Sequence, residues 1–432
     1  MGGLAMQAFA CKRTIGSVLH SISASPHARV LGMRPALGSF AAATYPNVGL
    51  QTRSVSGKRR HTGRAVYHKN RTLRIRAHLP PEPFEGDYEK NPRPPIDWSR
   101  WRSEDNPDVD RIELALAHPP LETDPPAPGP AKHTLTITGT KTRRVDRRGA
   151  QVVTCFLGQD PSVEYVAKIY DGVYYPLDFD GDEVINFDGM TWADRNYSIE
   201  AWAYRIMQPA IGSTGVVPAY FGSWTFPLNA SHRRQRWVRM ILVDLIQGEC
   251  MADIIDRAVD KDENVNYALL PPEDFRLRVL QSILEADEAI WWEAAINHLD
   301  LVPRNVVVKP DGSVTIIDFS QVYINKFSCY DCDHPRKDDP TQLPISPIER
   351  YWPFPSGFAD SAIQGGPWEA WIPARWLEDH GLAVEYLVAT FRDSPKYAPP
   401  SPEFLDTEWD PSVGQKSLGL LDSLGRKLVK QA

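Results

Sequence analysis

The segment from residue 298 to residue 319 restricts the fold of this chain more than any other part of the sequence. A long helix-forming run precedes it and opens at Pro272, reading PEDFRLRVLQSILEADEAIWWEAAI. The polar stretch HLDLVPRN follows, and then two apolar runs, VVVK and VTIID, which are separated by the turn Pro310–Ser313. Proline, aspartate and glycine in such a turn favour a β-hairpin. The sequence therefore predicts a long helix, a polar loop and a hairpin in immediate succession.

Strand-like patterns dominate the sequence upstream of that helix. HTLTITGTKT alternates between apolar and polar residues, and VVTCFL, YVAKIY, VVPAYFGSW and VRMILVDLI supply further short apolar runs. Between them, NYSIEAWAYRIMQ has the apolar spacing of a helix, for which Ser198 is a candidate N-cap. Regular patterning starts near His133. The prediction is an α+β chain, with five strands and one helix in residues 133–246 and mainly helices in residues 247–432.

The polar loop and the hairpin together resemble the protein kinase superfamily, whose catalytic loop reads H-x-D-L-x-x-x-N and is followed by D-F-G. His298, Asp300 and Asn305 match the loop, and Asp318 with Phe319 matches the second motif. VAKIYD, YFGSWTF, HLDLVPRN and IIDF are similar to a group of kinase-like proteins common in fungi. The resemblance covers residues 133–325. It implies a bilobal protein kinase-like fold, with a small antiparallel β-sheet N-lobe and a mainly helical C-lobe.

The resemblance also implies roles for three catalytic residues. Phosphoryl transfer has a loose transition state, so a protein promotes it mainly by positioning groups and offsetting charge. Lys168 lies in the third predicted strand and would hold the α- and β-phosphates of ATP. Glu200 would orient its ammonium from the following helix. Asp300 would orient the acceptor hydroxyl and take its proton.

Metal and adenine sites are implied in the same way. Mg²⁺ prefers oxygen ligands and keeps several waters, so few protein ligands suffice. Asn305 and Asp318 would supply them through an amide and a carboxylate oxygen. Adenine would bind backbone groups of the connector formed by Asp244, Leu245 and Ile246. ATP and Mg²⁺ are thus the expected cofactors.

Several departures from the kinase pattern keep other functions open. G-x-G-x-x-G is missing between the first two predicted strands, where only Gly139 and Gly149 flank KTRRVDRR. That basic turn is either a charge-based substitute or a solvated loop. Leu299 stands where many kinases have arginine, Ser320 replaces the glycine of D-F-G, and no A-P-E follows. The main expectation is an ATP-dependent phosphotransferase with a protein or small-molecule acceptor. The alternatives are a pseudokinase that acts as a binding module, and a small-molecule kinase of the aminoglycoside or choline type.

Charge and proline content set the first 132 residues apart. Residues 1–81 carry 13 Lys or Arg and no Asp or Glu, which leaves a net charge of −20 on the remainder. Such an acidic body argues against binding to nucleic acid, whose affinity for proteins comes from cationic contacts. Thirteen prolines between residues 80 and 130 predict a linker over residues 81–132 that packs on the following domain, with a short helix in DVDRIELALAH.

Residues 1–80 are expected to be a disordered basic leader. Residues 1–60 have the composition of a transit peptide, which would direct the protein to mitochondria, whereas a plain tail would leave it cytoplasmic. No apolar run approaches the roughly 20 residues of a membrane span, and five cysteines make no disulfide framework. The chain is therefore expected to be intracellular and without a transmembrane segment.

Overall fold

The computed structural model describes most of residues 66–400, and every element below belongs to the unit formed by Lys58–Ala432. The described residues are 66–88, 92–94, 96–97, 101, 109–122, 132–141, 149–175, 188–231, 233–260, 264–328, 341–350, 368–379 and 381–400. Residues 1–65 of the predicted leader and most of the basic turn KTRRVDRR lie outside them. The expectation that the leader is disordered as far as residue 80 was wrong, because residues 72–77 form a strand that pairs with two others. No helix in the described part combines the length and apolar character that a membrane span requires.

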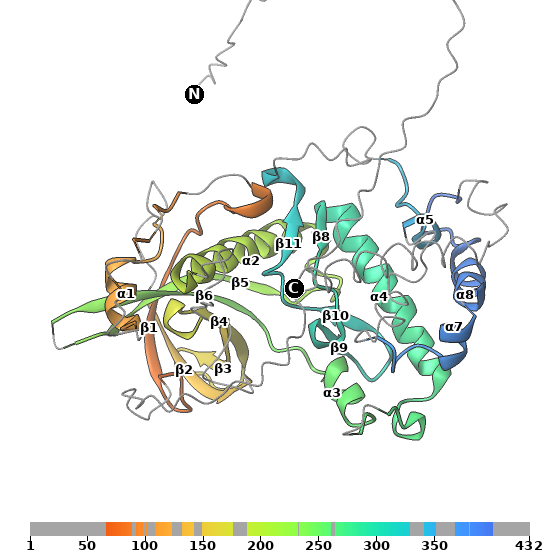
Figure 1. Ribbon diagram of the computed structural model, residues 1–432, viewed down its shortest axis with the longest axis horizontal. Coiled ribbons are helices and arrows are strands. Elements are labelled where there is room, and N and C mark those ends of the chain that lie inside the picture. The colour runs from red at the N-terminus through yellow and green to blue at the C-terminus, as the bar shows by residue number, and fades with distance from the viewer. Residues whose placement is uncertain are drawn as a thin grey trace, which may run out of the picture. The chain divides into compact units, whose positions relative to one another are not determined.

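Six antiparallel strands form a closed barrel in the order β1-β2-β3-β4-β6-β5, on the left of Figure 1. These strands are β1 (Thr72–Ala77), β2 (Lys132–Thr140), β3 (Gln151–Leu157), β4 (Tyr165–Tyr170), β5 (Tyr220–Asn229) and β6 (Gln235–Asp244). Alternate side chains of each strand point inward, as the pleat of a strand requires. Leu135, Ile137, Val153, Ala167 and Phe226 are among the fully buried residues of this interior.

Strand β1 is the element that the sequence prediction missed. Its sequence TLRIRA buries Leu73 and Ile75 and exposes the residues between them, but three arginines in residues 71–76 hid this alternation in a basic segment. β1 pairs with β2 on one side and with β5 on the other. Regular structure therefore begins well before His133, and a sixth strand closes the expected five-stranded sheet into a barrel.

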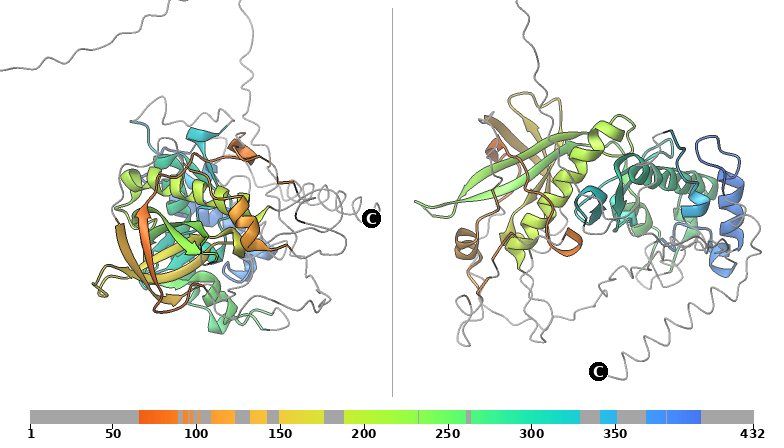
Figure 2. Two further views of the ribbon diagram at one scale, coloured as in Figure 1. Left: turned by 90° about the vertical axis from the view of Figure 1, so that its left-hand side faces the viewer. Right: turned by 90° about the horizontal axis from the view of Figure 1, so that it is seen from above.

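Helix α2 (Gly189–Ile211) lies between the barrel strands and α4 in the view from above (Figure 2, right). The expectation that Ser198 caps this helix was wrong. Asp188 is the N-cap, and its carboxylate accepts a hydrogen bond from the backbone N–H of Met190 at 2.9 Å. Ser198 lies inside the helix, where its hydroxyl donates to the carbonyl oxygen of Arg195. The helix thus starts earlier than predicted, because the apolar face that it buries extends back to Met190.

The rest of the described chain is mainly helical and carries two small sheets. Its elements are β7 (Glu249–Cys250), α3 (Met251–Asp256), α4 (Glu273–Ala294), β8 (Ile296–His298), β9 (Val306–Val308), β10 (Val314–Ile316), β11 (Val322–Ile324), α5 (Pro347–Arg350), α7 (Ala374–Glu378) and α8 (Gly381–Phe391). β9 and β10 form the predicted hairpin, with β7 beside β9, and β11 pairs with β8. One core joins α2 and α4 to these strands. Mixed helices and antiparallel sheets thus confirm the expected composition of the fold.

The proline-rich segment packs against the elements that follow it. The predicted short helix is present as α1 (Arg111–Ala117), which Asp110 caps through its carboxylate. Leu114 is fully buried against Met190 at the start of α2. Arg111 donates to the carbonyl oxygens of Val173 and Tyr175 at 3.0 and 2.8 Å. These contacts show that the segment wraps onto the folded domain, as expected.

Candidate active site

Lys168 lies in the middle of β4, and its ammonium is held between two carboxylates. Its Nζ donates to Glu200 Oε2 and to Asp318 Oδ1, each at 2.6 Å. The side chain is 13% exposed. Burial alone would lower the pKa of Lys168, but the charges of Asp318 and Glu200 outweigh it and raise the pKa. The lysine therefore stays protonated, and the structure brings together three residues that the sequence singled out.

Glu200 lies in α2 and is 1% exposed. Its Oε2 also accepts a hydrogen bond from the hydroxyl of Tyr170 at 2.5 Å, and its Oε1 accepts one from the backbone N–H of Phe319 at 3.3 Å. Burial raises the pKa of Glu200, and the Lys168 ammonium opposes that shift. A buried carboxylate is tolerated when charged and hydrogen-bonded partners surround it in this way. Glu200 in α2 is thus hydrogen-bonded both to β4 and to the segment after β10.

Asp318 follows β10 and has a φ of 65°, which non-glycine residues rarely adopt. Its Oδ1 accepts hydrogen bonds from Lys168 Nζ and, at 2.7 Å, from the hydroxyl of Ser320. Burial opposes ionisation here, but the charge and hydrogen bond of Lys168 and the hydrogen bond of Ser320 hold the pKa of Asp318 well below its usual range. The Asp318 side chain is nevertheless 38% exposed. It is therefore an ionised carboxylate with an open side.

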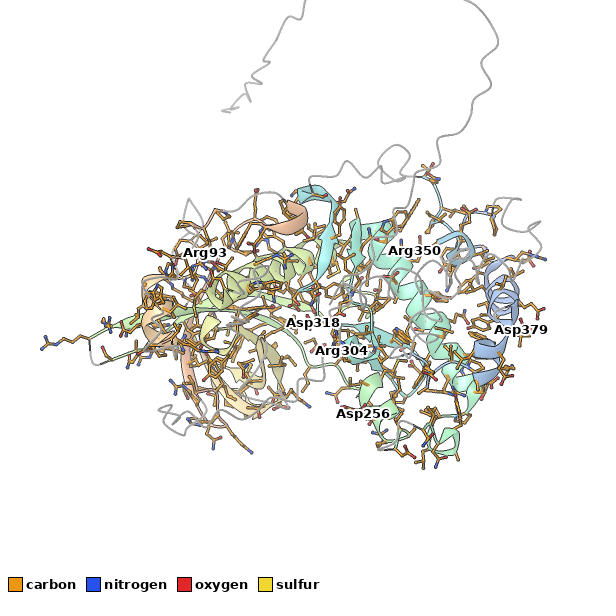
Figure 3. The ribbon with its side chains drawn as sticks, in the orientation of Figure 1. Arg93, Asp256, Arg304, Asp318, Arg350 and Asp379 are labelled. Atoms are coloured by element: carbon orange, nitrogen blue, oxygen red, sulfur yellow. The ribbon has the colours of Figure 1, made fainter. Side chains whose placement is uncertain are left out.

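The loop after β8 brings Asp300 and Asn305 together in a second group. Asn305 Nδ2 donates to the carbonyl oxygen of Asp300 at 2.7 Å and to Asp300 Oδ2 at 3.1 Å. Arg304 Nη2 donates to both carboxylate oxygens of Asp300, at 2.8 and 2.7 Å. Figure 3 shows Arg304 and Asp318 in the region between the barrel strands and α4, whereas Asp256 lies by α3.

His298 contacts the loop that carries Asp300 and also the residues next to Asp318. The backbone N–H of Asp300 donates to His298 Nδ1 at 3.3 Å, which places the ring proton on Nε2, 3.2 Å from the carbonyl oxygen of Ile317. Burial lowers the pKa of His298, so the ring is neutral. Its ring also packs against Phe319, with 5.1 Å between the centroids. His298 thus links the loop that carries Asp300 to the residues on both sides of Asp318.

Each of the two predicted magnesium ligands keeps one side-chain oxygen that these contacts do not use. Because Nδ2 of Asn305 donates to Asp300, the amide oxygen is its remaining ligand atom. Oδ1 of Asp318 is engaged by Lys168 and Ser320, which leaves Oδ2. The described residues hold no cluster of three or more His, Cys, Asp or Glu that could bind a metal. One carboxylate and one amide suit Mg²⁺, which usually keeps several waters and phosphate oxygens as its other ligands.

The connector after β6 is the third part of the expected site. The backbone N–H of Asp244 is engaged, because it donates to the carbonyl oxygen of Ala219 at 2.9 Å. Leu245 and Ile246 follow the end of β6, and their backbone groups form no hydrogen bonds with any part of the chain that the structure describes.

Two residues at this site were given no role by the sequence. Tyr170 is two residues after Lys168, so both side chains project from the same face of β4 and reach Glu200. That spacing could have indicated Tyr170. Arg304 belongs to none of the motif positions, and its contact with Asp300, four residues earlier, follows from the turn Pro303–Asn305.

No known family model matches the chain, and no curated protein matches it in sequence. Solved structures do resemble it. The ROP18 kinase domain in complex with AMP-PNP and sucrose is 18% identical, with a TM-score of 0.30, over 50% of this chain and 60% of that one. ROP2 from Toxoplasma gondii, described as a virulence factor with a protein-kinase fold and no enzymatic activity, is 10% identical, with a TM-score of 0.31, over 60% and 57%.

WbdD, crystallised with the kinase inhibitor LY294002, is 15% identical, with a TM-score of 0.28, over 62% of this chain and 49% of that one. The chain thus spans between 49% and 60% of the length of these three structures. TM-scores this low assign no function to the chain.

Proposed function

We propose that this chain is a kinase-like phosphotransferase that moves the γ-phosphoryl group of ATP to a hydroxyl group of a protein or a small molecule. Its two lobes would meet at the connector, with β1 and residues 133–246 in the N-lobe and residues 247–432 in the C-lobe. The observation that carries this proposal is the Lys168 ammonium, 2.6 Å from both Glu200 and Asp318. Taking three charges out of water is costly, and such clusters concentrate at functional sites.

The charge of this cluster indicates what it would bind. One ammonium and two carboxylates give the cluster a net charge of −1. Because Asp318 is the more exposed of the two carboxylates, this negative charge is accessible to a ligand at the site. A divalent cation together with a polyphosphate would satisfy both signs. Asn305 and Asp318 would hold Mg²⁺, which would offset the charge of the phosphate oxygens. Lys168 would bind the α- and β-phosphate oxygens, with Glu200 keeping its ammonium in place, and Asp244, Leu245 and Ile246 would bind adenine through the backbone.

Asp300 would act on the acceptor. The acceptor hydroxyl would lose its proton to the Asp300 carboxylate as its oxygen bonds to the γ-phosphorus, while the bond from that phosphorus to the β,γ-bridging oxygen breaks and ADP leaves. Asn305 keeps the carboxylate in position by donating to Oδ2 at 3.1 Å. A positioned general base of this kind contributes about 10²- to 10⁴-fold to a rate.

One observation favours the alternative of a pseudokinase that only binds nucleotide or a partner. Arg304 Nη2 donates to both oxygens of Asp300, which leaves the proposed base paired with a cation. The Arg304 side chain is 61% exposed, however. An exposed ion pair is weak, so a bound acceptor could displace the arginine at small cost.

Two measurements test the proposal. Thermal melting with Mg-ATP should raise the Tm of the protein, because a ligand that binds the folded state stabilises it. ATP turnover should fall by about 100-fold or more in Asp300→Asn. Asp256→Asn, an exposed aspartate on α3, is the matched control and should turn over ATP at the wild-type rate.

The outcomes separate the two functions. A Tm shift without turnover would favour the pseudokinase. No Tm shift at millimolar Mg-ATP would contradict the phosphotransferase and leave only a pseudokinase that binds a partner. Equal turnover by wild type and Asp300→Asn would remove Asp300 from the role of base.

A further inference from the structure

The residues that follow β1 form a segment that contacts both α2 and β11. We call this segment, His78–Tyr88, the strap. The strap is hydrogen-bonded to α2 on both sides of Glu200. His78 Nδ1 lies 2.6 Å from the hydroxyl of Tyr197, three residues before Glu200. The indole N–H of Trp202, two residues after Glu200, donates to the carbonyl oxygen of Pro81 at 2.9 Å. The strap therefore fixes the part of α2 that carries Glu200.

Tyr88, at the end of the strap, is bonded to β11. Figure 1 shows the orange one-turn helix Gly86–Tyr88 beside β11. The Tyr88 hydroxyl donates to the carbonyl oxygen of Val322 at 2.6 Å and accepts from the backbone N–H of Ile324 at 3.2 Å. A tyrosine hydroxyl can do both at once. The Tyr88 side chain thus occupies the edge of β11 that does not pair with β8.

Those two backbone groups depend on Tyr88 because water does not reach them. Val322 is 3% exposed and Ile324 is fully buried. In an antiparallel pair, only every second residue hydrogen-bonds to the partner strand. Gln321 and Asn325 bond to the residues that flank β8, so Val322 and Ile324 direct their N–H and C=O groups away from β8. A buried backbone group without a partner is strongly unfavourable. Loss of the Tyr88 hydroxyl would therefore favour displacement of β11 from its present position.

The pair formed by β8 and β11 is close in sequence to both Asp300 and Asp318. β11 begins four residues after Asp318, and its partner β8 ends at His298, two residues before Asp300. Asp318 has a φ of 65° and persists in that conformation only while its surroundings hold it. We propose that Tyr88 is a positioning residue, whose hydroxyl keeps Asp318 in place for nucleotide binding while the strap holds the helix of Glu200. This inference rests on the proposed phosphotransfer.

Tyr88→Phe removes the hydroxyl and keeps the buried ring. If β11 then leaves its position in most free molecules, the binding-competent fraction falls, and the KM for Mg-ATP rises by the inverse of that fraction. We expect a rise of about tenfold with kcat within about twofold of wild type, because saturating nucleotide restores the bound arrangement. Hydrogen exchange should become faster in residues 318–328 of the free variant and slow again with Mg-AMP-PNP.

Tyr67→Phe is the matched control. Tyr67 is buried to a similar extent, and its hydroxyl donates at 2.6 Å to Asp171, whose carboxylate is paired with Arg236 and not with Lys168. The control should lower the Tm without changing the KM. If Tyr88→Phe gives too little folded protein, Trp202→Phe removes the bond to Pro81 from the other end of the strap and should raise the KM in the same direction.

The results distinguish this inference from the proposed function. An active wild type with an unchanged KM in Tyr88→Phe, or with exchange that is faster throughout the protein, would overturn the inference alone. A wild type that neither binds nor turns over Mg-ATP would remove the proposed function and the inference with it.

Discussion

Replacement of Lys168 by methionine should destabilise the protein and abolish turnover for separate reasons. Glu200, which is 1% exposed, would keep only Tyr170 and the N–H of Phe319 as donors among the residues that the structure describes. Removing one partner of a buried ion pair costs about 3–5 kcal/mol. Because Asp318 is partly open to water, we expect the lower end, about 3 kcal/mol. For a domain of this size that corresponds to a decrease in Tm of about 6 °C.

A double variant separates charge burial from chemistry. Lys168→Met with Glu200→Gln leaves a neutral amide in place of the unpaired carboxylate, so we expect about 2 kcal/mol of the loss to return. ATP turnover should stay absent, because the ammonium that would bind the phosphates is still missing. Lys396→Met is the control, since its ion pair with Glu285 is 64% exposed on the lysine side and should be worth less than about 1 kcal/mol.

Urea unfolding at pH 7, followed by tryptophan fluorescence, measures these free energies, provided that the m-values of the variants agree. The reasoning would be refuted by a loss below about 1 kcal/mol in Lys168→Met, or by a double variant no more stable than the single one. Either result would mean that the cluster is solvated in solution.

Three further changes test other parts of the molecule. Burial raises the pKa of Glu288 from 4.5 to about 7, so the folded state keeps a proton that the unfolded state releases, and stability falls as the pH rises from about 4.5 to about 7. Glu288→Gln should flatten this slope in urea midpoints measured from pH 5 to 8, and an unchanged slope would contradict the assignment. Arg304→Ala should alter stability by less than about 1 kcal/mol and leave ATP turnover at or above the wild-type rate, because the acceptor then has no arginine to displace from Asp300; a loss of turnover of about tenfold or more would show instead that Arg304 positions Asp300. Ala295 ends α4 with a φ of 52°, so Ala295→Gly should stabilise by about 0.5–1 kcal/mol, and a lower Tm would contradict this.

Local sequence patterns predicted most of the elements near the site. The hairpin of β9 and β10, the long helix after Pro272 and the short helix in the proline-rich segment are present where expected. Errors arose where the pattern depended on distant partners. Ser198 has the chemistry of an N-cap, but the helix continues back to Gly189 because Met190 packs against α1. β1 lies in a segment so basic that its alternation was not recognised as a strand.

The sequence by itself determined the types and order of the site residues, since strand and helix periodicity places Lys168 in a strand and Glu200 in a helix. Only the tertiary structure decided that Lys168 contacts Glu200, 32 residues away, and Asp318, 150 residues away. It also decided that β1 closes the barrel and that Tyr88 completes the edge of β11. The physical reason is that periodicity reports which face of an element is buried, whereas the partner of that face depends on packing between segments far apart in the chain.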